Sequence, residues 1–75
     1  MRVQVRYFAS LREMRGVAEE MAELTEGMTA GDAYRRLCPP GELPVAYAVN
    51  QVRVGRDTLL AEGDELVFLP PLGGG

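Results

Sequence analysis

Two strand patterns stand at opposite ends of this short chain, and together they restrict the folds that it can adopt. Residues 2–8 alternate between apolar residues and a second set that ends in Phe8, as in a half-buried strand. Residues 65–69 (ELVFL) are apolar on both faces after the first residue, as in a buried central strand. A first and a last strand of this kind favour a mixed sheet in which the two pair in parallel at the centre.

The segment between these strands contains one principal helix. Thr29 is a candidate N-cap with Asp32 three residues later, close to a capping box, and apolar residues recur at helical spacing as far as Cys38. Shorter patterns predict one or two helical turns at residues 9–14 and strands at 45–49 and 52–54. One helix packed across a mixed sheet is an α+β architecture, and the β-grasp arrangement is the obvious candidate.

Residues 17–24 are ambiguous. Met14, Val17, Met21 and Leu24 stand at helical spacing, and Ala, Glu and Met all favour a helix. As a strand, the same segment alternates poorly. Local sequence therefore predicts a helix here.

The C-terminal residues form a distinct segment. Pro70 and Pro71 are stiff and extended, whereas Leu72, Gly73, Gly74 and Gly75 form a flexible tail, so we divide the chain into a domain at 1–71 and a tail at 72–75. A terminal Gly-Gly can enter a channel that is too narrow for other residues, and there it offers only its α-carboxylate. The alternative is a frayed end or a cloning remnant.

Composition excludes several classes of function. The formal net charge of −3 argues against a protein that binds nucleic acid by neutralising phosphates. One cysteine and no histidine exclude a disulfide framework and the usual zinc sites, and fit a reducing cytoplasm. We expect no signal peptide and no membrane-spanning segment. All eight basic residues are arginine, so no lysine side chain can accept an isopeptide bond.

The sequence predicts no self-contained active site. Without histidine, the usual general base is missing, and Cys38 is expected to be a small core residue. The acidic residues Glu19, Glu20, Glu23 and Glu26 are read as a solvated face, or as a surface that complements a basic partner. The carboxylate of Gly75 remains as the reactive group. A partner that binds ATP could convert it to an acyl adenylate, which sulfide, persulfide or a thiol could then capture.

Three segments carry a resemblance to a known family. They are residues 7–13 (YFASLRE), residues 48–51 (AVNQ) and residues 62–71 (EGDELVFLPP), which runs into the glycine tail. In this order they resemble the ubiquitin-like MoaD/ThiS sulfur carriers, and above all the small subunits of molybdopterin synthase. The resemblance implies a β-grasp fold with a strand, not a helix, at residues 17–24, and we follow it there.

The resemblance also implies a function and partners. Gly75 would be the reactive residue and Gly74 the other half of the Gly-Gly motif. An adenylating enzyme of the MoeB kind would use ATP to activate Gly75, with no cofactor bound by this chain, and a cysteine desulfurase or rhodanese would supply sulfur. A large synthase subunit of the MoaE kind would then take the sulfur into the pterin dithiolene. Leu72 and Gly73 depart mildly from family tails, which commonly have Val and a small residue at these two places.

The sequence also predicts a partner surface beside the tail. If the first and last strands are parallel neighbours, their carboxyl ends lie together. Phe8 and Leu69 should then both point outward and form an exposed apolar patch where the tail begins. The alternative is that a loop or the short helix at 9–14 covers them.

Three other functions remain open at this point. A sulfur carrier for thiazole synthesis or tRNA thiolation would use the same fold and activation. A ubiquitin-like protein modifier would end in isopeptide bonds to other proteins. A plain interaction domain would have an inert tail.

Overall fold

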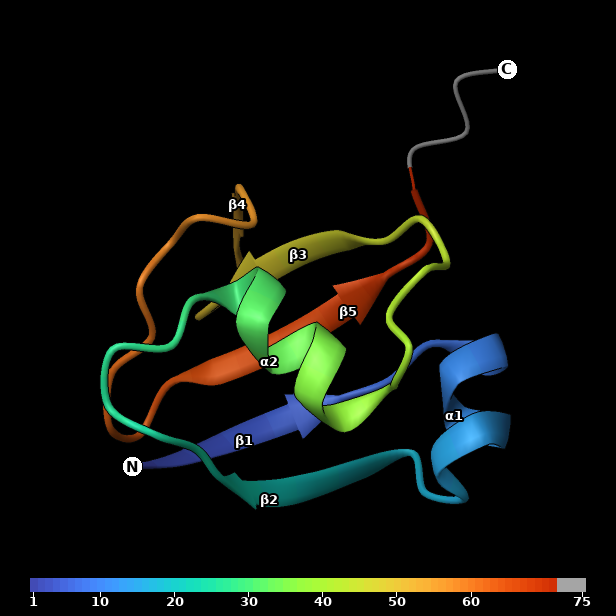
Figure 1. The fold of residues 1–75 in the computed structure, drawn as a ribbon, viewed down its shortest axis with the longest axis horizontal. Helices are drawn as coiled ribbons and strands as arrows, with labels where there is room; N and C mark the ends of the chain where they lie inside the picture. Colours follow the sequence, from blue (N-terminus) through green and yellow to red (C-terminus); the bar gives the residue numbers. More distant parts are fainter. Residues whose placement is uncertain (72–75) are drawn as a thin grey trace.

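The computed structural model describes residues 1–71 (Figure 1). The elements in chain order are β1 (Arg2–Arg6), α1 (Ala9–Arg15), β2 (Glu19–Glu23), α2 (Ala30–Leu37), β3 (Ala46–Val49), β4 (Val52–Val54) and β5 (Glu65–Leu69). Neither helix of this described part is long and apolar enough to cross a membrane.

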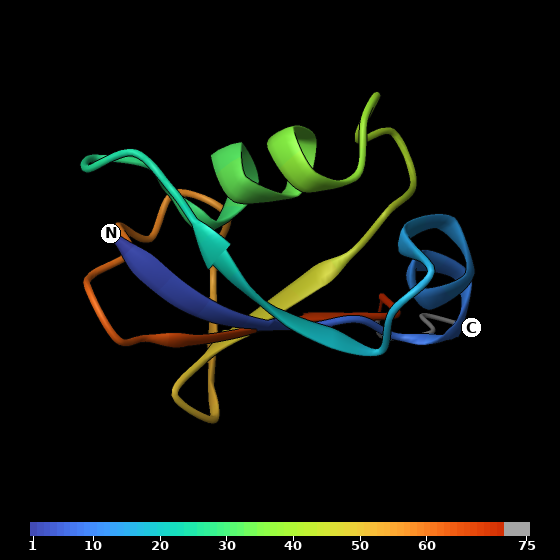
Figure 2. The same cartoon turned by 90° about the horizontal axis from the view of Figure 1, so that it is seen from below.

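The five strands form one mixed sheet in the order β2-β1-β5-β3-β4. The first and last strands are parallel neighbours at its centre, with Gln4 opposite Glu65 and Val5 opposite Leu66. The other pairs are antiparallel. The helix α2 lies across one face of the sheet (Figure 2). The parallel central pair and the α+β β-grasp architecture that the sequence predicts are confirmed.

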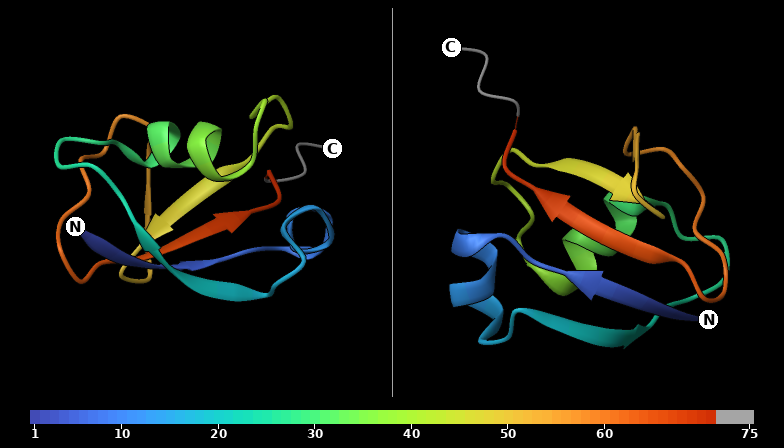
Figure 3. Two further views of the ribbon diagram at one scale, coloured as in Figure 1. Left: turned by 60° about the horizontal axis from the view of Figure 1, so that its bottom comes forward. Right: turned by 180° about the vertical axis from the view of Figure 1, so that it is seen from behind.

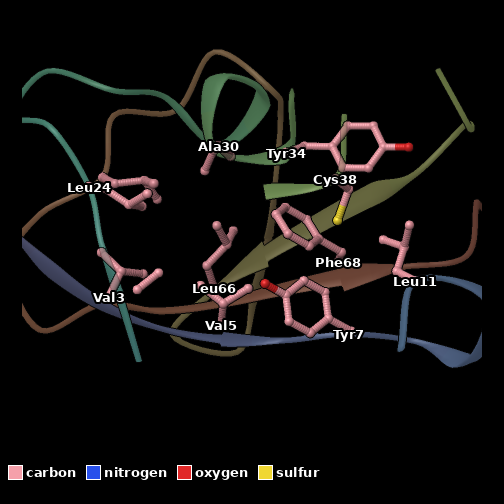
Figure 4. Close-up of a cluster of buried hydrophobic side chains, with 13 residues drawn as sticks. Val3, Val5, Tyr7, Leu11, Leu24, Ala30, Tyr34, Cys38, Leu66 and Phe68 are labelled. Carbon is pink, nitrogen blue, oxygen red and sulfur yellow. The ribbon is translucent and has the colours of Figure 1, made fainter. Parts of the chain in front are cut away.

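The core lies between α2 and the sheet (Figure 4). Val3, Val5, Leu66 and Phe68 are fully buried on the face that α2 covers. Phe68 is the centre of an aromatic cluster. The centroid of its ring lies 5.8 Å from the ring centroid of Tyr7, 5.4 Å from that of Tyr34 and 6.0 Å from that of Tyr47. Rings at these separations stabilise a core beyond the area that they bury, which matters in so short a chain.

A capping box starts α2. The hydroxyl oxygen of Thr29 accepts a hydrogen bond from the backbone N–H of Asp32 at 3.1 Å, and a carboxylate oxygen of Asp32 accepts the backbone N–H of Thr29 at 3.0 Å. Two N–H groups that the helix leaves without intrahelical partners are thereby satisfied. The predicted cap and helix are both confirmed.

The ambiguous segment contains a strand. The residues of β2 pair antiparallel with β1, and the backbone N–H of Tyr7 donates to the carbonyl of Ala18 at 2.9 Å. Ala22 and Leu24 are buried in the core. The strand implied by the family resemblance is therefore correct, and the helix favoured by local propensity is wrong, because pairing with β1 and burial of two side chains outweigh it.

Candidate functional site

The C-terminal segment begins at one edge of the sheet, which we call the exit edge. The strand β5 ends there at Leu69, and the exposed residues Pro70 and Pro71 follow. Because β1 runs parallel to β5, the carboxyl end of β1 and residue Phe8 reach the same edge (Figure 1). The structure thus gathers four of the predicted site residues at the exit edge. The other four, Leu72, Gly73, Gly74 and Gly75, lie outside the described residues.

Phe8 differs from its prediction. The strand β1 ends at Arg6, and Phe8 is the N-cap residue of α1, with its carbonyl accepting the N–H of Arg12 at 2.7 Å. Its side chain is half-buried and packs partly against the core, and Leu69 is half-buried as well. The prediction of an exposed patch is therefore correct in direction for Leu69, which does not pack against the core, and wrong for Phe8, because the turn into α1 takes Phe8 out of the strand alternation.

The sheet face opposite α2 carries a small apolar surface instead. Since Leu66 and Phe68 face the core, the alternate residues Val67 and Leu69 point to the opposite face. Residues directly paired across strands share a face, and Ala46 pairs with Leu69 and Ala48 with Val67. We call Ala46, Ala48, Val67 and Leu69 the outer strip; Ala48 is buried and the other three are half-buried. Within the described residues no helix covers this face (Figure 3, right).

Arginine side chains border the outer strip. Arg6 is paired with Val67 on one side, and Arg53 with Ala48 on the other. Arg6 also lies 3.2 Å from Glu19 and 3.9 Å from Glu65. An apolar centre with a charged rim is typical of a protein–protein contact surface. The strip ends at Leu69, so it leads directly to the exit edge.

The acidic residues in and just after β2 are mostly a solvated face, as predicted. Glu19, Glu23 and Glu26 are exposed, and the first two form ion pairs at 3.2 Å with Arg6 and Arg2. Exposed pairs of this kind contribute little to stability. Glu20 is the exception.

Glu20 belongs to a polar cluster that fixes α1, which sequence reasoning missed. One carboxylate oxygen of Glu20 accepts the hydroxyl of Tyr7 at 2.5 Å and two guanidinium N–H groups of Arg15, at 2.9 and 2.6 Å. Arg15 also donates to the carbonyl of Leu37, the last residue of α2, at 3.1 Å. We call Tyr7, Glu20 and Arg15 the clamp. The clamp joins the segment after β1 to β2 and to both helices. The only sign of it in the sequence is the number of Arg and Glu residues in this region.

The clamp perturbs the ionisation of its members. The hydrogen bond from Tyr7, and then those from Arg15, lower the pKa of Glu20 below its ordinary value. Burial raises the pKa of the Tyr7 hydroxyl, and its hydrogen bond to Glu20 raises it further. The glutamate is therefore held ionised and the tyrosine neutral, which stabilises the cluster at neutral pH.

The Gly-Asp-Glu turn of the family motif has a structural role away from the exit edge. The carboxylate of Asp64 accepts the side-chain amide of Asn50 at 3.0 Å and the backbone N–H of Ala61 at 2.8 Å. The side-chain oxygen of Asn50 accepts the N–H of Glu65 at 3.0 Å. These bonds join the β3–β4 turn to the start of β5, so the side chains of this motif stabilise the end of the sheet opposite the exit edge.

A hollow of about 400 Å³ lies at the N-terminal end of α2. It is lined by Thr29, Gly31, Asp32, Arg35, Arg56 and Asp57. Its charges are already partly matched, since Arg35 lies 2.8 Å from Asp32. Sequence reasoning missed this hollow because Arg56 and Asp57, in the loop between β4 and β5, line it from far along the chain.

No group of three or more His, Cys, Asp or Glu side chains within residues 1–71 is arranged to hold a metal ion. Cys38 is 2 % exposed and belongs to the core, as predicted. Burial raises the pKa of its thiol. A buried, protonated thiol is a poor nucleophile.

Comparison with known proteins identifies the family and the fold of the chain. The chain matches the ThiS family over residues 5–75. It is 34 % identical to the molybdopterin synthase sulfur carrier subunit of Chlamydomonas reinhardtii, and the alignment covers all of both chains.

Two solved structures have the same fold. The putative molybdopterin converting factor, subunit 1, from Pyrococcus furiosus superposes with a TM-score of 0.80 at 31 % identity, over 96 % of this chain and 99 % of that one. The small archaeal modifier protein 1 of Haloferax volcanii superposes with a TM-score of 0.77 at 25 % identity, over 95 % and 98 %. The chain is thus similar in fold both to a molybdopterin converting factor subunit and to a protein modifier.

Proposed function

The chain belongs to the ThiS family, and from this premise we propose that it is a sulfur carrier for molybdopterin synthesis. Gly75 is the reactive residue, and Gly74 completes the Gly-Gly motif that enters the active sites of the partners. Leu72 and Gly73 connect this motif to the rigid Pro70-Pro71 segment. The match to a sulfur carrier subunit over the full length of both chains supports this assignment.

The proposed chemistry has three steps. A carboxylate oxygen of Gly75 attacks the α-phosphate of ATP, which forms an acyl adenylate and releases pyrophosphate. The terminal sulfur of a donor persulfide then attacks the acyl carbon, and the bond to AMP breaks, which leaves Gly75 joined to the donor through an acyl disulfide. A second thiol attacks the donor sulfur of this disulfide, so that Gly75 leaves as a thiocarboxylate and the donor and the thiol form a new disulfide. The adenylating enzyme binds the ATP in this scheme, and this chain binds no cofactor.

The single observation that carries the proposal is the anchoring of the C-terminal segment. The strand β5 is the middle strand of the sheet, with Leu66 and Phe68 fully buried, and it passes directly into the exposed Pro70 and Pro71. A fixed base of this kind holds the start of the tail in one place relative to the outer strip. A partner that binds the outer strip can therefore receive the C-terminus at a defined position.

The proposal requires three partners. An adenylating enzyme activates Gly75, a sulfur donor such as a cysteine desulfurase or rhodanese supplies the sulfur, and a large synthase subunit receives it. We propose that these partners use Phe8, Leu69, Pro70 and Pro71 at the exit edge together with the rest of the outer strip. The single buried cysteine suits a reducing compartment, so we propose a cytoplasmic location.

The experiment is intact mass spectrometry after expression beside a cognate adenylating enzyme and a sulfur source. We expect the mass gain that replaces one oxygen by sulfur. A variant that lacks Gly74 and Gly75 is the matched control and should show no gain. An unchanged mass for the full-length chain, with an enzyme that is active on its own carrier, would contradict the proposal.

A second function is favoured by one observation, the similarity to a protein that is named a small archaeal modifier. In that case the activated Gly75 would be transferred to amines of other proteins. The same experiment separates the two functions, because a modifier gives a ladder of larger conjugates. Carriers for thiazole or tRNA give the same mass gain as the proposed carrier, so reconstitution with a large synthase subunit and a pterin precursor decides between them.

A further inference from the structure

The nucleophiles of this chain are unusually few. None of its 75 residues is lysine, and all eight basic side chains are arginine, whose guanidinium stays protonated. The amine of the chain is therefore the α-amino group of Met1, and its thiol is that of Cys38. An acyl adenylate reacts readily with amines and thiols, so the position of these two groups decides whether the carrier can acylate itself.

The amine of Met1 is partly buried and hydrogen-bonded at the end of the sheet. It donates a hydrogen bond to the carbonyl of Leu24 at 2.7 Å, and the N–H of Leu24 donates to the carbonyl of Met1 at 2.7 Å. These reciprocal bonds extend the β1–β2 ladder by one pair. The amine must leave this pair before it can turn freely toward an acyl group.

The topology also separates Met1 from the exit edge. Gln4 pairs with Glu65 in parallel, so Met1 and Pro70 lie on opposite sides of this pair, at the two ends of the sheet (Figure 1). Along the strand direction, Met1 lies three residues before this pair and Pro70 lies five residues after it. The two residues are therefore about eight residues apart along the strands, or about 26 Å at 3.3 Å per residue. The five residues from Pro71 to Gly75 span at most about 18 Å. Gly75 therefore cannot reach the amine of its own chain while the sheet is intact.

The thiol of Cys38 is withheld by burial. Its side chain is 2 % exposed, and its sulfur points into the core toward Phe68 (Figure 4). Desolvation raises the pKa of this thiol, which keeps it protonated. The activated C-terminus of a neighbouring chain therefore cannot reach the thiol of Cys38, and it finds no lysine side chain on this surface.

We propose that this fold withholds its own amine and thiol from acylation, so that an activated Gly75 is transferred to a partner and not to the carrier itself. This inference rests on the proposed function. In the reaction that is prevented, an amine nitrogen would attack the acyl carbon of the adenylate, the bond from that carbon to the AMP oxygen would break, and a proton would pass to water. Because these two groups are withheld and the chain has no lysine, the protein also forms no chains with copies of itself, whether it serves as a carrier or as a modifier.

The test uses small reagents and does not depend on adenylation. The intact protein is treated with an N-hydroxysuccinimide ester of acetic acid and, separately, with N-ethylmaleimide, in buffer and in concentrated guanidinium chloride. We expect one acetyl group and one maleimide in denaturant, and both reactions at least about tenfold slower in buffer, because they require opening of the native state. Acetylation or alkylation of the native protein at the denatured rate would overturn the inference.

The variant Arg12→Lys is the matched positive control. Arg12 is exposed on α1, which lies beside the exit edge (Figure 1), so its replacement adds one accessible amine without a change of charge. This variant should take one acetyl group rapidly in buffer, which proves that the reagent is competent.

A second arm uses the cognate adenylating enzyme with ATP and no sulfur donor. We expect pyrophosphate release without self-linked product for the native chain. Self-linked carrier would overturn the inference, whereas absence of pyrophosphate release would contradict the proposed function and leave the reagent test to decide the inference.

Discussion

The hydroxyl of Tyr7 donates a 2.5 Å hydrogen bond to the carboxylate of Glu20, and Arg15 donates to the same oxygen. Through this one carboxylate, the end of β1 is joined to β2 and to α1, the helix that follows Phe8 at the exit edge. The clamp therefore determines where α1 stands relative to the site.

Replacement of Tyr7 by Phe removes one bond of the clamp and leaves the ring in the core. We expect a loss of about 1.5–3 kcal/mol in the free energy of unfolding, since the bond is to an ionised group. Urea denaturation measures it. Tyr34→Phe, which removes a neutral bond to the carbonyl of Leu43, is the control and should cost less. Equal losses in the two variants would contradict a special role for the clamp.

The clamp also predicts a pH dependence. The pKa of Glu20 is lower in the folded chain than its ordinary value of 4.5, so its contribution to stability is fully present above pH 4.5 and is lost as the pH falls through the folded pKa. Glu20→Gln should be less stable than the native chain at neutral pH, and the difference should shrink as the pH falls below 4.5. Denaturation at a series of pH values measures this. A constant difference, or the same profile in the exposed control Glu26→Gln, would contradict it.

The sequence predicted the principal helix best, because the capping box of Thr29 and Asp32 is formed by residues three apart in the chain and needs no contact with distant residues.

The capping box also gives a stability prediction. Thr29→Ala should cost about 1 kcal/mol of stability, while Thr25→Ala, at an exposed position before α2, should cost much less. Melting curves of both variants measure the difference. Equal melting temperatures would show that the capping box contributes nothing.

Other features could not be predicted locally. The segment that contains β2 favours a helix by composition, and it becomes a strand because β1 offers a partner and the core takes Ala22 and Leu24. Phe8 continues the alternation of β1 in the sequence, yet α1 begins immediately after it. The clamp and the hollow beside α2 depend on side chains that meet only after folding, so no spacing in the sequence reveals them.

The outer strip predicts a partner contact. Val67→Glu places a charge at its centre, on the face that α2 does not cover, and should weaken binding to the adenylating enzyme or the large synthase subunit about tenfold or more without unfolding the domain. Val52→Glu, at an apolar residue of β4 that is 61 % exposed and outside the strip, is the control. Isothermal titration calorimetry measures both affinities. Undiminished binding of the Val67 variant would remove the strip from the interface.

The last prediction concerns the length of the tail. Deletion of Gly75 alone leaves Gly73-Gly74, so a terminal Gly-Gly survives, but the carboxylate withdraws by up to about 3.5 Å of extended chain. Positioning errors on the order of 1 Å can cost about a hundredfold in rate. If a partner grips the outer strip while the tail reaches a fixed ATP, adenylation of this variant should fail in a pyrophosphate exchange assay.

Deletion of both Gly74 and Gly75 should also abolish exchange, and it should leave the melting temperature unchanged, because the buried core residues of the described chain lie between Val3 and Phe68. A chain in which Gly75 is replaced by Ala keeps the length and separates the two requirements. Exchange that survives in this variant and fails after deletion of Gly75 means that reach is limiting. Failure in both means that the partner's channel also rejects a methyl group. Unchanged exchange after the double deletion would remove Gly75 from the mechanism, and the carrier function would fall with it.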